Sequence, residues 1–244
     1  MLKLHKIYTA FFLFLCIFSL SCNKSSSNIS YGQIRGVVRL VDDLNNPQTF
    51  AGMQVTAENT GISTISDSTG KYILNGLQNG MYNLIFSKPG YGTFILAGFN
   101  NNGNVLDHPS IVPLITLGQF STTTLTALNV NVNNDSVMLR PTIDPAGTVD
   151  QPRGIRFFYG TTPDISNENF SAYSKVYQLS NPTGILKISA DYFYSLGFSA
   201  GDTIYIKGYG DAFFSNDYDD PQTGQHIFPN LNETSTTAVS FILP

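Results

Sequence analysis

The sequence contains no tryptophan and only two cysteines among its 244 residues. One of them, Cys16, lies in the apolar N-terminal segment, so the chain from Cys22 onward can form no internal disulfide. Charged residues make up 12% of the chain, and the net charge at pH 7 is −4. A nucleic-acid-binding protein presents a basic patch or stripe, and this balance offers none. We therefore expect no nucleic-acid partner.

The motifs of several enzyme classes are also missing. There is no metallopeptidase His-Glu spacing, no Gly-x-Ser-x-Gly segment and no glycine loop for phosphate. After the N-terminal segment only Cys22, His108 and His226 could supply nitrogen or sulfur ligands, fewer than the four of structural zinc. We expect no zinc, no cofactor and no catalytic role. The alternative is a hydrolase with His108 or His226 as its base.

The N-terminal segment has the layout of an export signal. Basic side chains precede an apolar stretch, residues 7–20, which is shorter than the about 20 apolar residues of a transmembrane helix. Ser21 and Cys22 follow, and then a polar run rich in Asn and Ser.

This arrangement resembles a bacterial lipoprotein signal, which is cleaved before a cysteine that then carries lipid. The resemblance implies a signal peptide over residues 1–21, lipid attachment at Cys22 and a tether over residues 22–32. Asn23 stands where inner-membrane retention signals carry Asp, so we expect the outer membrane, on its periplasmic or surface face. Because the rest of the chain is acidic, we expect attachment to depend on the acyl chains. The alternative is an ordinary secretory signal with an incidental Cys22.

Turn residues divide residues 63–91 into short strands. Asp67 and Gly70 suit the first and fourth positions of a type I turn, and Pro89-Gly90 suits the centre of a type II turn. Asn79-Gly80 predicts a further reversal, so we expect hairpins here.

Alternating apolar residues mark half-buried strands on both sides of these turns. We expect strands at residues 34–41, 53–57, 81–87, 92–99 and 111–117, with a loop at residues 100–104. Tyr82, Leu84 and Phe86 should share one face of their strand.

These segments occur in the order of a known family. The likeness rests on residues 36–38 (Gly-Val-Val), 50–55 (Phe-Ala-Gly-Met-Gln-Val), 66–72 (Ser-Asp-Ser-Thr-Gly-Lys-Tyr), 77–84 (Leu-Gln-Asn-Gly-Met-Tyr-Asn-Leu) and 88–91 (Lys-Pro-Gly-Tyr). The chain here resembles the carboxypeptidase regulatory-like domain, which implies a seven-stranded transthyretin-like sandwich over residues 33–118. Members of that family are mostly attachments to other proteins, and some are grouped with carbohydrate-binding-like folds. The resemblance implies no peptidase activity.

A second set of strand patterns begins near Phe120. The strands are expected at residues 128–132, 137–139, 155–159, 185–188, 202–209 and 237–243, with a short helix between Ser189 and Gly197. Residues 196–209 are similar to part of a fibronectin type III-like domain, in which Tyr205 would be the corner tyrosine. The prediction is an all-β chain of two consecutive antiparallel β-sandwiches after a cleaved signal peptide, the second over residues 120–244.

A long segment from residue 211 to about 236 separates the last two predicted strands, and loops of such length tend to be functional. The candidates for stacking against a sugar are Tyr209, Phe213, Phe214 and Tyr218. The simpler interpretation is that these rings pack the edge of the sandwich.

The same segment has an acidic tip, residues 216–220. Asp217, Asp219 and Asp220 supply oxygens of the kind that calcium prefers, although their spacing matches no known calcium loop. A solvated turn is the simpler interpretation.

We therefore expect a lipid-anchored accessory protein of the outer membrane with a non-catalytic binding or scaffold role. Its partner beyond the membrane would be a glycan or an outer-membrane protein. The alternative is a structural spacer or a segment of an adhesin.

The lipid anchor can be tested by metabolic labelling. Replacing Cys22→Ser removes the thiol that would carry the acyl chain, so we expect incorporation of labelled fatty acid to be abolished. The control is Cys16→Ser, which should leave labelling unchanged. Equal labelling of the Cys22→Ser variant and the wild type would contradict the anchor.

Overall fold

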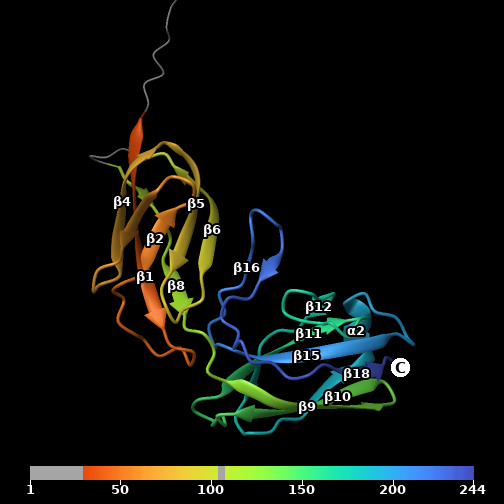
Figure 1. Ribbon diagram of the computed structural model, residues 1–244. Coiled ribbons are helices and arrows are strands. Elements are labelled where there is room, and N and C mark those ends of the chain that lie inside the picture. The colour runs from red at the N-terminus through yellow and green to blue at the C-terminus, as the bar shows by residue number, and fades with distance from the viewer. Residues whose placement is uncertain (1–29, 104–107) are drawn as a thin grey trace, which may run out of the picture. The chain divides into compact units, whose positions relative to one another are not determined.

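The computed structural model describes residues 30–103 and 108–244, and residues 31–244 belong to one compact unit. The expected signal peptide, Cys22 and most of the expected tether lie outside the described residues. The described chain is nearly all β, as the alternation of its side chains predicts (Figure 1). No helix in this part of the chain is long and apolar enough to cross a membrane.

The first sandwich consists of two sheets that face one another across a shared core. One sheet has the order β4-β1-β7, with β8 also paired to β1, and the other has the order β3-β2-β5-β6. The core contains the predicted face of β5, with Leu84 and Phe86 buried and Tyr82 packed against them. The strands are β1 (Tyr31–Val41), β2 (Gln54–Ala57), β3 (Ile62–Ile65), β4 (Lys71–Gln78), β5 (Gly80–Ser87), β6 (Phe94–Asn101), β7 (Ser110–Ile111) and β8 (Ile115–Gly118).

Two of the predicted turns form with the expected hydrogen bonds. The Gly70 N–H donates to the Asp67 carbonyl at 2.9 Å, and the Tyr91 N–H donates to the Lys88 carbonyl at 3.0 Å. In the first turn the Thr69 hydroxyl also donates to the Asp67 carboxylate, which lowers the pKa of that carboxyl below its usual value.

The prediction of hairpins over residues 63–91 is confirmed at Pro89-Gly90, where β5 and β6 pair antiparallel, and is wrong for the two earlier reversals. β4 pairs with β1, whereas β3 and β5 pair with β2, so the chain changes sheet on entering β4 and again at Asn79. A single residue between β4 and β5 is fewer than the two of the tightest common hairpin loops. The alternation of side chains fixes which face is buried, but it does not specify the partner strand.

Asn101 departs from the expected loop at residues 100–104, because it ends β6 and is fully buried. Its Nδ2 donates to the Gln78 carbonyl at 3.0 Å, and its Oδ1 accepts from the Ser110 hydroxyl at 3.1 Å. These bonds tie the end of β6 to β4 and β7, which belong to the other sheet.

Residues 111–117 close the first sandwich as predicted, but they run parallel to β1 and not antiparallel. They also form two short strands, β7 and β8, and not one. Pro113 lies between them, and proline has no N–H with which to continue a ladder.

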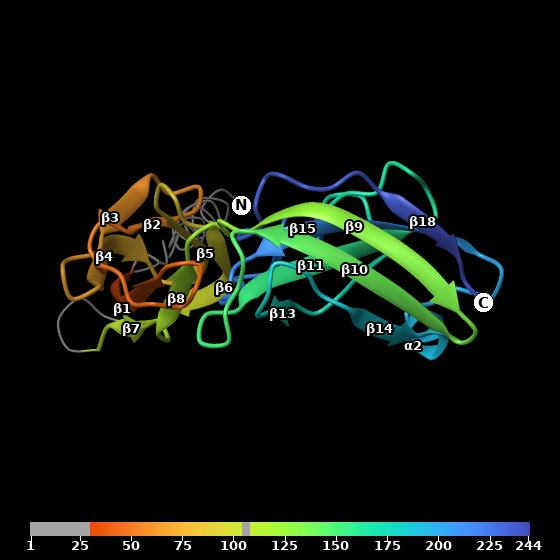
Figure 2. The ribbon, with the colours of Figure 1, turned by 90° about the horizontal axis from the view of Figure 1, so that it is seen from below.

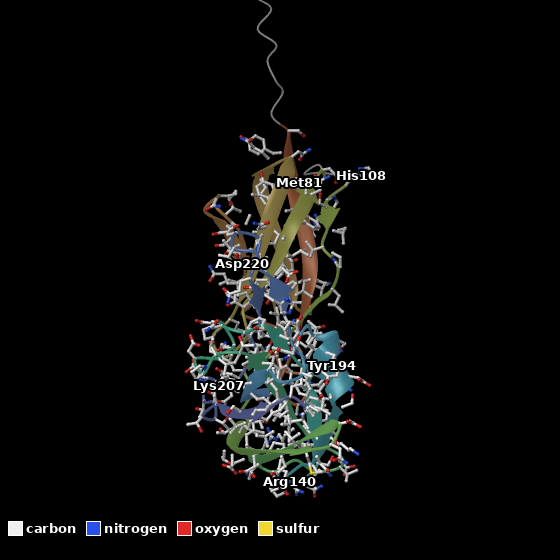
Figure 3. All side chains as sticks on the ribbon, turned by 90° about the vertical axis from the view of Figure 1, so that its right-hand side faces the viewer. Met81, His108, Arg140, Tyr194, Lys207 and Asp220 are labelled. Atoms are coloured by element: carbon white, nitrogen blue, oxygen red, sulfur yellow. The ribbon has the colours of Figure 1, made fainter. Side chains whose placement is uncertain are left out.

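The second sandwich also has two sheets, of order β14-β10-β9 and β12-β11-β15-β18, with β13 paired to β11. Figure 2 shows β9 and β10 as a long hairpin, and Asn134 turns it with a φ of 47°. The predicted helix is α2 (Ala190–Ser195), where the Ser189 side chain accepts from the Tyr192 N–H. Its exposed Tyr194 is labelled in Figure 3. The strands are β9 (Thr124–Asn133), β10 (Ser136–Asp144), β11 (Arg153–Gly160), β12 (Ala172–Tyr173), β13 (Tyr177–Leu179), β14 (Leu186–Ser189), β15 (Thr203–Asp211) and β18 (Val239–Ile242).

β11 is buried on both of its faces, although its alternation predicts only one buried face. Phe157 and Tyr159 point into the core between the two sheets, whereas Phe158 belongs to a separate apolar cluster. The outer side of this sheet is therefore covered by other parts of the chain.

Candidate functional site

The long segment between β15 and β18, residues 211–236, supplies much of that cover. The separate cluster joins Phe158 and Tyr209 of the sheet to Phe228 and Leu231 of the segment, together with Ile165. The Phe158 and Phe228 rings meet edge to face, with centroids 4.9 Å apart. Most of the segment is thus packed structure and not a free loop.

A buried ion pair fastens the start of the segment. Arg156 on β11 donates from Nε to Asp211 Oδ2 at 2.7 Å, and the two side chains are 5% and 0% exposed. Its guanidinium also donates to the Ser174 carbonyl and lies 4.8 Å from the centroid of the Phe228 ring. Burial raises the pKa of the Asp211 carboxyl, and the adjacent guanidinium opposes that rise.

The tip of the segment is a small hairpin of β16 (Tyr218–Asp219) and β17 (His226–Ile227). The His226 ring stacks on Tyr173 with centroids 5.0 Å apart. Its Nδ1 lies 2.7 Å from Asp219 Oδ1, and its Nε2 lies 3.4 Å from Asp217 Oδ2. Both ring nitrogens therefore face carboxylates, so neither is directed at a hydroxyl that it could activate. His108, the other candidate base, belongs to the first sandwich, just before β7.

Two buried asparagines bond the segment to the first sandwich. Asn216 Oδ1 accepts from the Gly118 N–H at 2.9 Å, and its Nδ2 donates to the Thr116 carbonyl at 2.7 Å. Asn230, which is 0% exposed, donates from Nδ2 to the Gly118 carbonyl at 2.7 Å and accepts the Asn216 N–H on Oδ1 at 2.8 Å. The end of β8 is thereby bonded to the segment by two side-chain amides.

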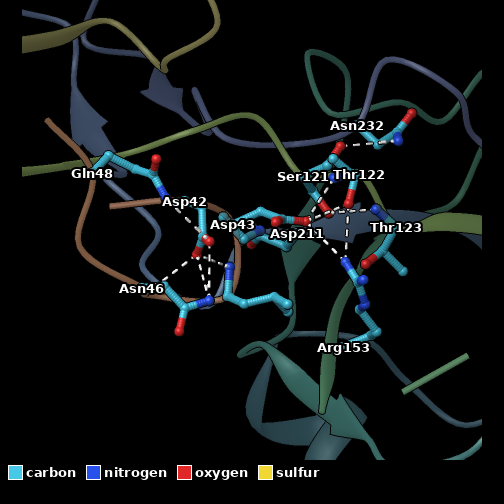
Figure 4. A network of polar contacts seen from close by, with 12 residues as sticks. Asp42, Asp43, Asn46, Gln48, Ser121, Thr122, Thr123, Arg153, Asp211 and Asn232 are labelled. Atoms are coloured by element: carbon cyan, nitrogen blue, oxygen red, sulfur yellow. Dashed lines mark hydrogen bonds and ion pairs between the residues drawn. The ribbon is translucent and has the colours of Figure 1, made fainter. Parts of the chain in front are cut away.

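Asp43, in the loop after β1, makes a second connection (Figure 4). Its Oδ2 accepts from the Thr122 N–H at 2.9 Å, from the Thr122 hydroxyl at 2.6 Å and from Arg153 Nη1 at 3.1 Å. Its carbonyl accepts from the Phe213 N–H at 2.8 Å. We call residues 116–123, with Asp43, Asn216 and Asn230, the junction.

Glycine allows the backbones in the junction to approach closely. A Cβ on Gly210 would lie 1.7 Å from the Thr123 carbonyl oxygen, and one on Gly118 would lie 2.6 Å from the Phe214 carbonyl oxygen. Real side chains do not tolerate such distances, so β15 and the 211–236 segment can lie this close to residues 118–123 only because Gly210 and Gly118 have no side chain.

The four candidate sugar-stacking rings do not share one environment. Tyr209 is only 5% exposed and meets Phe158 edge to face, so its faces are covered. Tyr218 packs edge to face on Phe94 of β6, with centroids 5.8 Å apart. Phe213 and Phe214 are 48% and 37% exposed, and the prediction of a stacking surface stays with these two.

The acidic tip is already supplied with hydrogen-bond donors. Asp217 and Asp219 face His226, and Asp220, labelled in Figure 3, accepts the Thr223 and Gln222 N–H groups at 2.8 Å. The bond from Thr223 is the main cause of a lowered pKa at Asp220. No group of three or more His, Cys, Asp or Glu side chains among the described residues could hold a metal ion. The structure gives the calcium prediction no support.

Sequence reasoning missed Arg156, Asp43 and the two junction asparagines. Arg156 carried a usable signal, because a charged side chain in the middle of an apolar strand needs a buried partner. The asparagines carried none, since Asn is abundant along the chain and is usually exposed.

Comparison with known proteins agrees with the first sandwich. Residues 33–108 match the family model of the carboxypeptidase regulatory-like domain. This match confirms the resemblance for the first sandwich. It ends before β7, and it says nothing of the second sandwich. No curated protein sequence matches the chain.

Several solved structures show a distant likeness. A chain of a type II cohesin–X-dockerin complex from Acetivibrio cellulolyticus is 18% identical, with a TM-score of 0.32. The match covers 37% of this chain and 59% of the other. A DUF3823 family protein from Parabacteroides merdae is 10% identical over 87% of this chain and 99% of its own, with a TM-score of 0.32. A suggested carbohydrate-binding protein from Bacteroides uniformis is 12% identical over 88% of this chain and 100% of its own, with a TM-score of 0.30. Scores this low support no conclusion about fold or function.

The buried ion pair makes a prediction about stability. Replacing Asp211→Asn removes the only fully buried counter-charge of Arg156 among the described residues and leaves the partly exposed Asp217 at 3.7 Å, so we expect the free energy of unfolding to fall by about 3–5 kcal/mol. Urea denaturation measures this change.

The matched control for the ion pair is Asp217→Asn. Asp217 lies 3.7 Å from Arg156 and is 32% exposed, so its loss should cost less than about 1 kcal/mol. Equal losses in the two variants would contradict the assigned role of Asp211.

Proposed function

We propose that this chain is a lipid-anchored accessory protein of the outer membrane that binds a glycan at the junction and has no catalytic role. The observation that carries the proposal is a set of exposed phenylalanines whose backbone lies in or directly beside the junction. Five Phe or Tyr side chains among the described residues are more than a third exposed: Tyr31, Phe120, Tyr194, Phe213 and Phe214. Three of these five, Phe120, Phe213 and Phe214, belong to residues 116–123 and to the 211–236 segment.

The backbones that carry these three rings are held by contacts with the first sandwich. The Phe120 N–H donates to the Gly90 carbonyl at 3.1 Å, and the Phe213 N–H donates to the Asp43 carbonyl at 2.8 Å. Phe214 follows directly, with its carbonyl packed on Gly118. Aromatic rings on a fixed backbone lose little conformational entropy when a ligand stacks on them, which favours binding.

The remaining parts of the proposal come from the sequence. The signal-like segment and the single cysteine at position 22 favour lipid attachment at the outer membrane. The second sandwich is proposed to be fibronectin type III-like, and its two sheets of antiparallel strands support this. Tyr205, on β15, packs partly buried against the Phe158 cluster.

Two rival functions differ from this proposal in what they need from the structure. A hydrolase would need a base with a free lone pair, and His226 faces a carboxylate on each side. A structural spacer would need only a stiff connection between the sandwiches, which the junction also supplies. The exposed phenylalanines favour a binding protein over a spacer, because a spacer needs no exposed aromatic side chains, whereas an interaction site often has them.

A glycan array on residues 24–244, followed by calorimetric titration of the best ligand, tests the proposal. We expect Phe213→Ala and Phe214→Ala each to weaken binding about tenfold or more, because truncating an aromatic anchor typically costs at least 1–2 kcal/mol. Tyr194→Ala is the control, an exposed aromatic on α2, and should bind as the wild type does.

Two results would count against glycan binding at this surface. The first is an array without any bound glycan, which would favour the spacer. The second is an equal loss of affinity in the Tyr194→Ala control.

A further inference from the structure

The outer face of the β4-β1-β7 sheet combines exposed apolar side chains with positive charge. Arg35, Val37 and Arg39 alternate along β1 with residues that enter the core, so their side chains share the outer face. Pairing places Ile73 of β4 and Ile111 of β7 on either side of Arg35, and Lys71 beside Val37. We call this set, with Leu114, the cationic face.

The cationic face exposes a group of neighbouring apolar side chains. Ile111 and Leu114 are 65% and 61% exposed, and Ile73 and Val37 are each more than a third exposed. Together with Arg35 and Lys71 they line a hollow of about 460 Å³. Single exposed apolar residues are ordinary, but a contiguous group with a charged rim is typical of an interaction surface.

The charge of this face is opposite to that of the whole chain. β1, β4, β7 and β8 contain Arg35, Arg39 and Lys71 and no Asp or Glu, whereas the net charge of the chain is −4. Among the described residues none of the three cations forms an ion pair. The Asp67 carboxylate accepts the Lys71 N–H at 3.0 Å and offsets part of the Lys71 charge, whereas the charges of Arg35 and Arg39 are available to an anionic partner.

We propose that the cationic face docks on the surface of an anionic phospholipid bilayer. Ile111 and Leu114 would enter the interface, while the Arg35, Arg39 and Lys71 side chains would lie against lipid phosphates. Lipid is the favoured occupant because this surface combines apolar side chains with positive charge, which is the requirement for binding at a membrane interface.

The position of the expected anchor also favours this occupant, and to that extent the inference rests on the proposed function. Tyr31, the first residue of β1, follows Cys22 by nine residues. A stretch of that length spans at most about 30 Å. A lipid at Cys22 would therefore keep β1, which carries three of the seven residues of the cationic face, near the bilayer. Stable attachment takes two membrane signals, and the face would supply one of them.

Vesicle sedimentation tests the proposal on the chain from residue 22 onward with Cys22→Ser, so that no acyl chain contributes. Residues 31–244 form one compact unit, and removing the signal leaves its cores complete. We expect binding to phosphatidylglycerol vesicles, weak binding to phosphatidylcholine vesicles, and a loss of binding as salt is raised from 0.05 M to 0.5 M, concentrations at which screening becomes strong.

Substitutions locate the contact. Arg35→Gln and Lys71→Gln should each lower the partition coefficient about fivefold, which corresponds to the usual contribution of one cation near an anionic surface. Ile111→Ser should lower it as well. The controls are Lys187→Gln and Val149→Ser, which change exposed residues of the second sandwich and should bind as the unsubstituted chain does.

Three outcomes would overturn the inference. They are an absence of binding to phosphatidylglycerol, an equal loss of binding in the controls, and a change from dimer to monomer in Ile111→Ser on gel filtration, which would show that a second copy covers the face. Since the tested chain carries no lipid, failed labelling at Cys22 or an empty glycan array leaves this test unaffected.

Discussion

The buried amides of Asn216 and Asn230 are the constraint on which the described structure depends. An amide withdrawn from water costs free energy unless its donors and acceptors are bonded. Here the partners are backbone groups of residues 116–119, at the end of the first sandwich. The 211–236 segment can therefore bury these side chains only while the two sandwiches stay joined, and each sandwich stabilises the other through it.

Further contacts hold the 211–236 segment in place at its start and at its tip. The Arg156–Asp211 ion pair fixes its start against β11, and the Phe228 ring covers the guanidinium on one side. The hairpin at its tip is held by His226 between two carboxylates and a tyrosine ring. A stretch whose length indicates a functional loop is thus mainly structural, and only Phe213 and Phe214 are presented to solvent as a stacking surface.

The sequence was sufficient for the longer strands and the cores, but not for the short strands β12, β13, β16 and β17 or for most of the pairing. Alternation placed Leu84 and Phe86 correctly because it reports which face is buried, and turn chemistry placed Asp67 and Pro89 correctly because it is local. Pairing of β4 with β1 depends on contacts between distant residues, which no local pattern encodes. The role of Asn216 and Asn230 could not be predicted for the same reason, since their partners are distant in the sequence. The net charge of the whole chain, which is negative, also gave no sign that β1 and β4 form a positively charged face.

Calorimetric unfolding tests the central claim most directly, because two joined sandwiches should unfold cooperatively and two independent ones should not. The account predicts one transition for the wild-type chain and two separate transitions for the Asn216→Ala/Asn230→Ala double variant. A wild-type chain that already unfolds in two separate transitions would contradict the claim that the buried amides hold the sandwiches together.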